Sequence, residues 1–158
     1  MSVVSVVSML AQPSVSVAQQ ETESKAPADA VKRWRDLRFG MFIHWGPVSL
    51  RGTEIGWSRA SQVTQDEYDN LYKEFNPVLF KADEWAKTAK DAGMKYMVLV
   101  TKHHDGFCLW NTKATDHNIM NSPFGRDVTK ELADACRKAG IEFGTYYSTC
   151  DWHNEFYP

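Results

Sequence analysis

The chain has 158 residues, of which 43% are hydrophobic, 13% aromatic and 24% charged. This composition is typical of a folded domain and excludes a disordered chain, whereas the length is short of the roughly 250 residues of a closed (β/α)8 barrel. A formal net charge of −2, from 18 basic and 20 acidic residues, gives no basis for binding a nucleic acid or an anionic membrane.

The first twenty residues carry no charged side chain. Their apolar stretch, residues 3–11, is too short and too rich in serine to span a bilayer, which takes about 20 apolar residues. Small residues at Ser16 and Ala18 match the cleavage pattern of a secretory signal peptide, although the usual basic start is missing. We therefore expect residues 1–27 to be a signal peptide and polar linker, with a disordered start as the alternative. A secreted, periplasmic or lysosomal location would follow from the signal.

Helical and extended patterns alternate after this segment. Residues 28–37 are predicted to form a short helix, and the aromatic and branched run at 38–45 a buried strand. Residues 62–75 have helical spacing, with Tyr68, Leu71, Tyr72 and Phe75 on one face. A further helix follows, in which Asp83 is the predicted N-cap, Gly93 ends the helix, and the shared face consists of Trp85, Ala86, Ala89 and Ala92.

The second half repeats the alternation. The apolar run at 95–101 predicts a strand covered on both faces, and a long loop over 102–126 carries three of the five histidines. Asp127 is expected to cap a helix that Gly140 ends, and Cys136 lies on its apolar face. Residues 141–147 predict a third strand. The order of strand, helices, strand, helix and strand is typical of a parallel α/β sheet.

Only eleven residues follow the third predicted strand, and none of them has a helical pattern. Three parallel strands with an uncovered edge cannot bury both faces of their sheet. We therefore expect residues 28–158 to be a fragment of a longer domain. The three cysteines, Cys108, Cys136 and Cys150, allow at most one disulfide, contain no C-x-x-C pair and are assigned no chemistry.

Polar and aromatic residues follow each predicted strand, where the binding groups of α/β proteins gather. His44 ends the first strand, His103 and His104 follow the second, and Tyr146 ends the third. Asp105, Asp151 and His153 lie close by in the sequence. A single histidine of this kind is more often structural than functional, but the set together predicts a site.

Two kinds of ligand suit this set. Imidazoles and Asp105 could bind a divalent metal, but adjacent histidines in extended backbone project in opposite directions, so His103 and His104 are poorly placed to share an ion. The favoured alternative is a neutral, hydroxyl-rich sugar, which imidazoles and phenols bind through hydrogen bonds. Trp45, Trp57, Trp110 and Trp152 could supply flat apolar platforms for the sugar ring, although a single tryptophan is more often a core residue than a platform.

Nucleotide-binding, serine-hydrolase and zincin motifs are missing from the sequence. Three segments instead resemble a known family: RFGMFIHWGPVS at 38–49, KYMVLVTKHHDGFCLWNTKATDHN at 95–118, and GRDVTKEL with AGIEFGTYYS at 125–148. They are similar to the amino-terminal part of the catalytic barrel of family 29 glycoside hydrolases, the α-L-fucosidases. The resemblance implies a (β/α)8 TIM barrel, here truncated to about its first three βα units.

The resemblance also implies an exo-acting, retaining hydrolase that removes terminal α-L-fucose from glycans or glycoconjugates without a metal or another cofactor. Carried over by motif, His44, His103, His104 and Tyr146 match residues that hydrogen-bond the fucose, and Trp57 matches one that lines its pocket. The family often has a glutamate directly before that tryptophan, where this chain has Gly56. Glu54, two positions earlier, is either a solvated loop charge or a replacement acceptor for a sugar hydroxyl.

Retaining hydrolysis needs two carboxyl groups about 5–5.5 Å apart. The family takes its nucleophilic aspartate from the end of the fourth strand and its acid/base from later still, so the resemblance implies that neither Asp105 nor Asp151 is catalytic. The fragment alone is then expected to be inactive. A non-catalytic fucose-binding relative, a metal hydrolase on the same barrel and an interaction domain remain as alternatives.

Overall fold

Three short parallel strands and the helices that connect them make up the described part of the chain. The computed structural model describes residues 26–157, so the predicted signal peptide falls almost entirely outside it. No helix within this range is long and apolar enough to cross a membrane. The elements in chain order are α1 Ala28–Leu37, β1 Gly40–Ile43, α2 Gln65–Asn70, α3 Ala82–Asp91, β2 Tyr96–Lys102, α4 Val128–Ala139 and β3 Glu142–Tyr147, with single 3-10 turns at Pro47–Leu50, Leu71–Lys73 and Ile119–Asn121.

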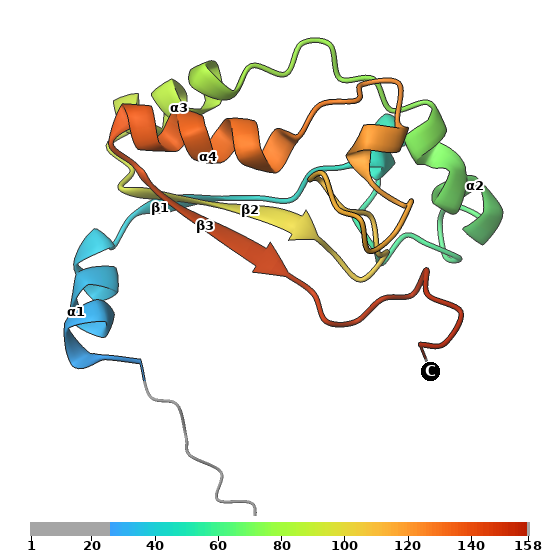
Figure 1. Cartoon of the computed structure of the whole chain (residues 1–158), viewed down its shortest axis with the longest axis horizontal. Coiled ribbons are helices and arrows are strands. Elements are labelled where there is room, and N and C mark those ends of the chain that lie inside the picture. The colour runs from blue at the N-terminus through green and yellow to red at the C-terminus, as the bar shows by residue number, and fades with distance from the viewer. Residues whose placement is uncertain (1–25, 158) are drawn as a thin grey trace, which may run out of the picture.

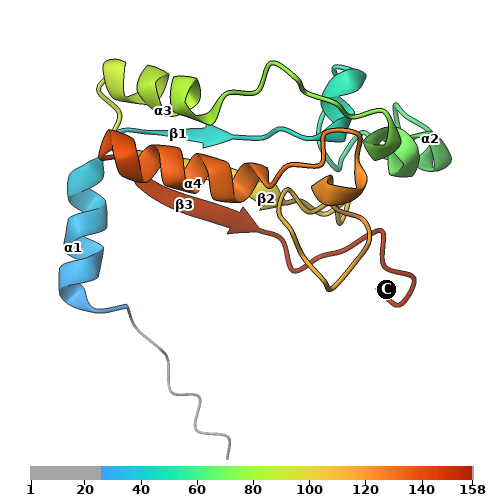
Figure 2. The same ribbon diagram turned by 45° about the horizontal axis from the view of Figure 1, so that its top comes forward.

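The strands pair in the order β1-β2-β3, and both pairings are parallel. In register, Met41 lies opposite Met97 and Met97 opposite Phe143. Helices α3 and α4 lie side by side over the same face of the sheet, as Figures 1 and 2 show. The predicted parallel α/β sheet is therefore confirmed.

The hydrophobic core fills the layer between this face and the two helices. Met97 and Leu99 project from β2 into it, and Leu132 and Cys136 of α4 meet them; all four are 0% exposed. Burying side chains of this size contributes roughly 1.5–3 kcal/mol each. The predicted position of Cys136 on the apolar face of its helix is confirmed, and all three cysteines are free thiols.

The opposite face of the sheet is covered much less by the described residues. Phe42 of β1 is 53% exposed and Tyr146 of β3 is 36% exposed, while Val98 of β2 is half-buried. Helix α1 lies near the starts of the strands, where Trp34 joins Val98 around a cavity of about 240 Å³. The prediction that β2 is covered on both faces is thus only partly met.

Local signals placed most helix ends correctly. The Asp127 side chain accepts a hydrogen bond from the backbone N–H of Lys130, and Gly140 ends α4 in the left-handed conformation at φ 72°. Gly93 follows α3 with φ 80°. The predicted cap at Asp83 is wrong, because α3 begins one residue before it and the Asp83 side chain lies exposed in the first turn.

Two predicted elements are shorter in the structure. The strand expected at 38–45 forms only over β1, because Arg38 is in the left-handed region at φ 55° and cannot continue an extended strand. The helix expected at 62–75 becomes α2 followed by a 3-10 turn, with Thr64 as the N-cap that accepts from Glu67 N. Its apolar face is real, since Tyr68, Leu71 and Phe75 are all buried.

Candidate functional site

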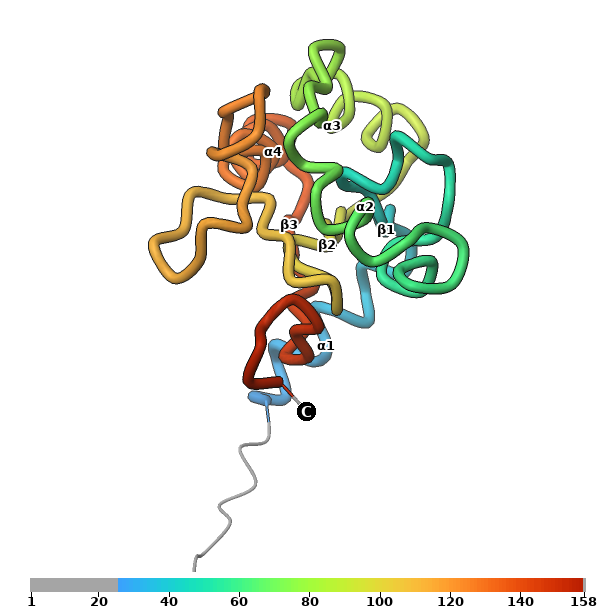
Figure 3. Tube along the Cα trace, turned by 90° about the vertical axis from the view of Figure 1, so that its right-hand side faces the viewer, coloured from blue at the N-terminus to red at the C-terminus, as the bar shows by residue number. Residues whose placement is uncertain are grey.

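The predicted site residues lie at the end of the sheet toward which all three strands point. Figure 3 looks onto this end, where the segments that follow β1, β2 and β3 come together beside α2. His44 follows β1, His103 and His104 follow β2, and Tyr146 belongs to β3. A parallel sheet brings such residues together because the carboxyl ends of its strands share one edge.

His103 is at the centre of this group. Its ring centroid lies 4.5 Å from that of His104, 5.8 Å from that of His44 and 6.1 Å from that of Tyr146, on which it stacks. Only 6% of His103 is exposed, and burial, followed by the neighbouring imidazoles, lowers its pKa to about 4. The ring is therefore neutral near pH 7 and offers hydrogen bonds rather than charge.

The expectation that His103 and His104 project in opposite directions is wrong. Strict alternation holds only within a strand, and β2 ends at Lys102, one residue earlier. Both histidines lie in the turn that follows, which directs their rings to the same side. The two imidazoles are thus able to contact one small ligand together.

Hydrogen bonds fix the tautomer of His104. Its Nδ1 lies 2.5 Å from Oγ of Ser148, and that hydroxyl donates its single hydrogen to the carbonyl of Cys150 at 3.1 Å. The Ser148 oxygen must then accept from Nδ1–H, which leaves Nε2 of neutral His104 as a hydrogen-bond acceptor. An acceptor at this position suits a ligand hydroxyl.

Two tryptophans border the histidines. Trp57 is 55% exposed and meets His104 edge-on at 5.4 Å and Trp152 at 5.3 Å between ring centroids, while Trp152 lies 5.0 Å from His104. Trp110 instead packs 6.0 Å from Tyr147. Trp45 is half-buried, and its ring packs against the core at Phe75, Phe80 and Trp85 while also lining a cavity beside His44.

Lys102 holds the segment after β3 in place. It is the last residue of β2 and only 4% exposed, and its Nζ donates to the carbonyls of Ser148 and Cys150, each at 3.1 Å. Nζ also pairs with the carboxylate of Asp151 at 3.1 Å. Trp152, which follows Asp151 directly, is positioned through this anchor.

The acidic residues at this end have different surroundings. Asp105 is 2% exposed and hydrogen-bonded to Tyr68, and Asp151 pairs with Lys102. Glu54 is exposed and lines a cavity of about 320 Å³ together with His44. Within residues 26–157, no group of three histidine, cysteine or acidic side chains is arranged to hold a metal ion.

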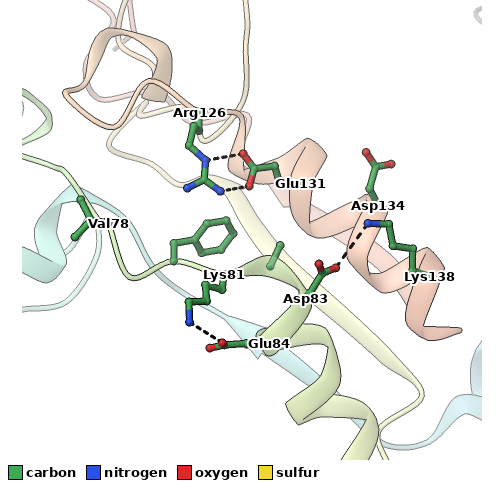
Figure 4. A pocket seen from close by; sticks show the side chains of 10 residues that line it. Val78, Lys81, Asp83, Glu84, Arg126, Glu131, Asp134 and Lys138 are labelled. Carbon is green, nitrogen blue, oxygen red and sulfur yellow. Dashed lines mark hydrogen bonds and ion pairs between the residues drawn. The ribbon is translucent and has the colours of Figure 1, made fainter.

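A larger cavity, of about 640 Å³, lies away from the strand ends, between the start of α3 and α4. Figure 4 shows charged side chains around it, of which Arg126 pairs with Glu131 and Lys81 with Glu84. These groups neutralise one another on an exposed surface, and such pairs contribute little energy. We therefore place the site at the strand ends, where uncharged donors and acceptors adjoin exposed aromatic rings.

Sequence reasoning missed three residues that shape this site. Helical spacing predicts only that Tyr68 lies on an apolar face, and it predicts no role for Lys102 or Ser148. Their partners lie 37 to 48 residues away in sequence, so no local spacing pointed to them. Lysine as the last residue of an otherwise apolar strand was the one usable signal.

This chain is similar in sequence to several known fucosidases. The sequence model of the alpha-L-fucosidase family matches residues 5–158. The chain is 35% identical to alpha-L-fucosidase 1 of Arabidopsis thaliana over 83% of its length, and 35% identical to the plasma alpha-L-fucosidase of Homo sapiens over 79%. It spans only 24% of the plant protein and 30% of the human one.

Solved structures agree with the sequences. The fold is similar to that of a family 29 alpha-L-fucosidase from Bacteroides thetaiotaomicron, with a TM-score of 0.77 and 38% identity over 85% of this chain and 33% of that one. That crystal structure holds a covalent intermediate trapped with 2-fluoro-fucosyl fluoride.

Proposed function

We propose that this chain, which belongs to the α-L-fucosidase family, supplies part of the sugar pocket of a glycosidase that removes terminal α-L-fucose from glycans or glycoconjugates. The observation that carries this proposal is the group of neutral rings around His103 at the strand ends. The chain spans about a quarter to a third of the relatives' length, so the proposed activity is that of the whole protein.

The proposed whole fold is a (β/α)8 TIM barrel, of which residues 28–158 would form about the first three βα units. In support, consecutive strands are neighbours and both crossover helices lie on one face of the sheet. A barrel needs this arrangement, because all its helices lie outside and its strands face inward. The exposed Phe42 and Tyr146 would then face the barrel interior.

For the sugar contacts we propose five residues. His44, His103, His104 and Tyr146 would hydrogen-bond the fucose hydroxyls, and the exposed face of Trp57 would pack on the apolar side of the ring. The acceptor Nε2 of His104 and the low pKa of His103 both suit an uncharged polyol.

The proposed mechanism is retaining hydrolysis through a covalent glycosyl-enzyme intermediate, supported by the trapped intermediate of the Bacteroides relative. Neither Asp105 nor Asp151 is suited to act as nucleophile or acid/base, since one is enclosed with Tyr68 and the other paired with Lys102. We therefore propose that the catalytic carboxylates belong to other parts of the protein, and that this chain alone is inactive. Two carboxyl groups suffice for the reaction, so the proposal includes no metal or cofactor.

Residues 1–27 are proposed to be a signal peptide and linker, which would direct the protein to a secreted, periplasmic or lysosomal location. One of the similar proteins is named a plasma fucosidase, which agrees with that assignment. Determining the amino terminus of the protein recovered from its own cells would test it, since cleavage near residue 19 is expected and an intact start would contradict it.

The experiment for the sugar site is a titration of the chain with L-fucose, followed by NMR of the histidine ring protons, with D-fucose as the stereochemical control. We expect shifts at His103 and His104 with L-fucose only. The variant His104→Phe should lose them, whereas Lys81→Ala, beside the cavity of Figure 4, should keep them. Equal responses to both enantiomers would contradict the proposal. Turnover of an aryl α-L-fucoside by the pure chain would contradict the placement of the catalytic carboxylates.

A further inference from the structure

Asp105 is a buried carboxylate for which the proposed sugar site has no use. Its Oδ2 accepts a hydrogen bond from the Tyr68 hydroxyl at 2.8 Å, and its Oδ1 accepts from the backbone N–H of Phe107 at 3.2 Å. Only 2% of the residue is exposed, so no ligand reaches it. Burying a carboxyl group costs free energy, and both oxygens of this one are already hydrogen-bonded within the protein. Its role is therefore a contact inside the protein.

Tyr68 connects this carboxylate to the loop that carries Trp57. Its hydroxyl has one hydrogen, which goes to Asp105, and the same oxygen accepts the backbone N–H of Gly56 at 2.7 Å. With its hydrogen donated to Asp105, the phenol oxygen has lone pairs free to accept the Gly56 N–H, so both hydrogen bonds form at once. Tyr68 is 4% exposed, and water does not compete for these bonds.

Gly56 lies directly against the central histidine of the site. Its φ is 72°, and a Cβ at this position would stand 2.5 Å from Nδ1 of His103. That nitrogen is buried and has no hydrogen-bond partner among the described residues. The backbone of the loop and the ring of His103 therefore limit each other's position, and a displacement of one displaces the other.

The two ends of the same loop are held separately. Residues on either side of Tyr68 in α2 make these contacts: Glu67 pairs with Arg51 at 2.6 Å, and Asp69 binds Arg59 through two hydrogen bonds of 2.6 and 2.7 Å. Neither contact involves the Tyr68 hydroxyl, so we expect both ends to stay attached when that hydroxyl alone is removed. The bond from Gly56 to Tyr68 ties the middle of the loop, where Trp57 lies, to α2, whereas the Trp57 backbone itself bonds to Ile55 and Ser61 nearby in the chain.

We propose that Asp105 and Tyr68 are positioning residues, which fix the backbone of Gly56 and thereby hold the Trp57 indole beside His104 for packing against the sugar ring. The consequence for sugar binding rests on the proposed function. The positioning itself is a property of the free protein.

Two measurements test the positioning without any ligand. In the wild-type chain, the Gly56 amide should exchange with deuterium at least about a hundredfold more slowly than an unprotected amide. In Tyr68→Phe, the Trp57 indole N–H, assigned through Trp57→Phe, should show a lower heteronuclear NOE. Tyr72→Phe removes a phenol hydroxyl on the next turn and should leave that NOE unchanged. Asp105→Asn leaves one acceptor oxygen for two donors, the Tyr68 hydroxyl and the Phe107 N–H, and should lower the NOE as well.

L-Fucose binding is the third measurement, and we expect Tyr68→Phe to raise the Kd roughly tenfold while Tyr72→Phe leaves it unchanged. Unprotected exchange at Gly56 would overturn the inference even if Tyr68→Phe failed to fold. An unchanged indole NOE in a folded Tyr68→Phe variant would also overturn it. If no variant binds L-fucose but the amide and indole respond as expected, the positioning stands and the proposed function fails.

Discussion

Acidification should lower the unfolding free energy of this fold, and much of that loss should come from His117. Replacing His117 with phenylalanine should therefore make the unfolding free energy less dependent on pH. His117 is 6% exposed in the loop after β2, and its ring stacks on that of His153, from the segment after β3, with centroids 3.9 Å apart and planes at 11°. Burial, followed by the His153 imidazole, lowers the pKa of His117 to about 4, against Asp69 and Asp151, which raise it.

The size of the effect follows from the two pKa values. Unfolded histidine titrates near 6.5, so the unfolded chain takes up a proton first as the pH falls. Stability from neutral His117 is therefore complete above about pH 6.5 and is lost progressively toward pH 4. A gap of about 2.5 pKa units corresponds to about 3.4 kcal/mol in full, of which about 2 kcal/mol is lost by pH 5.

Urea unfolding at pH 7.5 and pH 5 would measure this loss. His117→Phe keeps a ring in the stack and should show a difference between the two pH values smaller than that of wild type by about 2 kcal/mol. Phe107→Leu, which alters a ring 5.1 Å from His117, is the matched control and should lower stability equally at both pH values. His103, whose pKa is also lowered, makes the unfolding free energy fall with acidification in the same way. Burial raises the pKa of Asp105, which has the opposite effect. Each variant must therefore be compared with wild type at both pH values. An unchanged pH difference in His117→Phe would refute the reasoning.

Three further changes give sharp expectations. Gly56→Ala should cost about 2–3 kcal/mol in urea unfolding because its Cβ meets His103, whereas Gly52→Ala, at a similar φ of 65° but in open space, should cost about 1 kcal/mol; equal costs would contradict the close approach. Leu132→Ala, at a position 0% exposed, should lower the unfolding free energy by about 2–5 kcal/mol, and a loss below about 1 kcal/mol would place the core elsewhere. Trp57→Ala should weaken L-fucose binding several-fold by NMR titration yet change stability by less than about 1 kcal/mol, because the ring is 55% exposed.

Features that depend on a few neighbouring residues were predictable from the sequence. Helix α4 begins after Asp127 and ends at Gly140 as expected, because a side-chain cap and a left-handed glycine act within one turn of the chain. The strand β2 and the parallel order of the sheet followed from the apolar run and the alternation of elements. The gathering of His44, His103 and Tyr146 at one end then follows from parallel topology alone.

Features set by packing between distant segments were not predictable. Trp45 directly follows the exposed His44, yet its ring packs against the core beside Trp85 and leaves the residue half-buried. The apolar run places the end of β2 to within one residue, but it does not predict the turn that brings the rings of His103 and His104 together.

The candidate site shows why such residues escape a sequence pattern. The aromatic spacing of α2 correctly assigns Tyr68 to a buried face, and that assignment already explains a tyrosine there without its hydroxyl. The partners of the hydroxyl come from distant segments. Asp105 lies in the turn after β2, 37 residues away, and Gly56 lies in the loop after β1. The buried hydroxyl of Tyr68 therefore bonds one residue from each of two loops, Gly56 and Asp105, and fixes how the two loops lie relative to each other. A residue such as Tyr68, whose spacing in the sequence indicates only burial, can therefore determine the geometry of a strand-end site through the hydrogen bonds of its polar group.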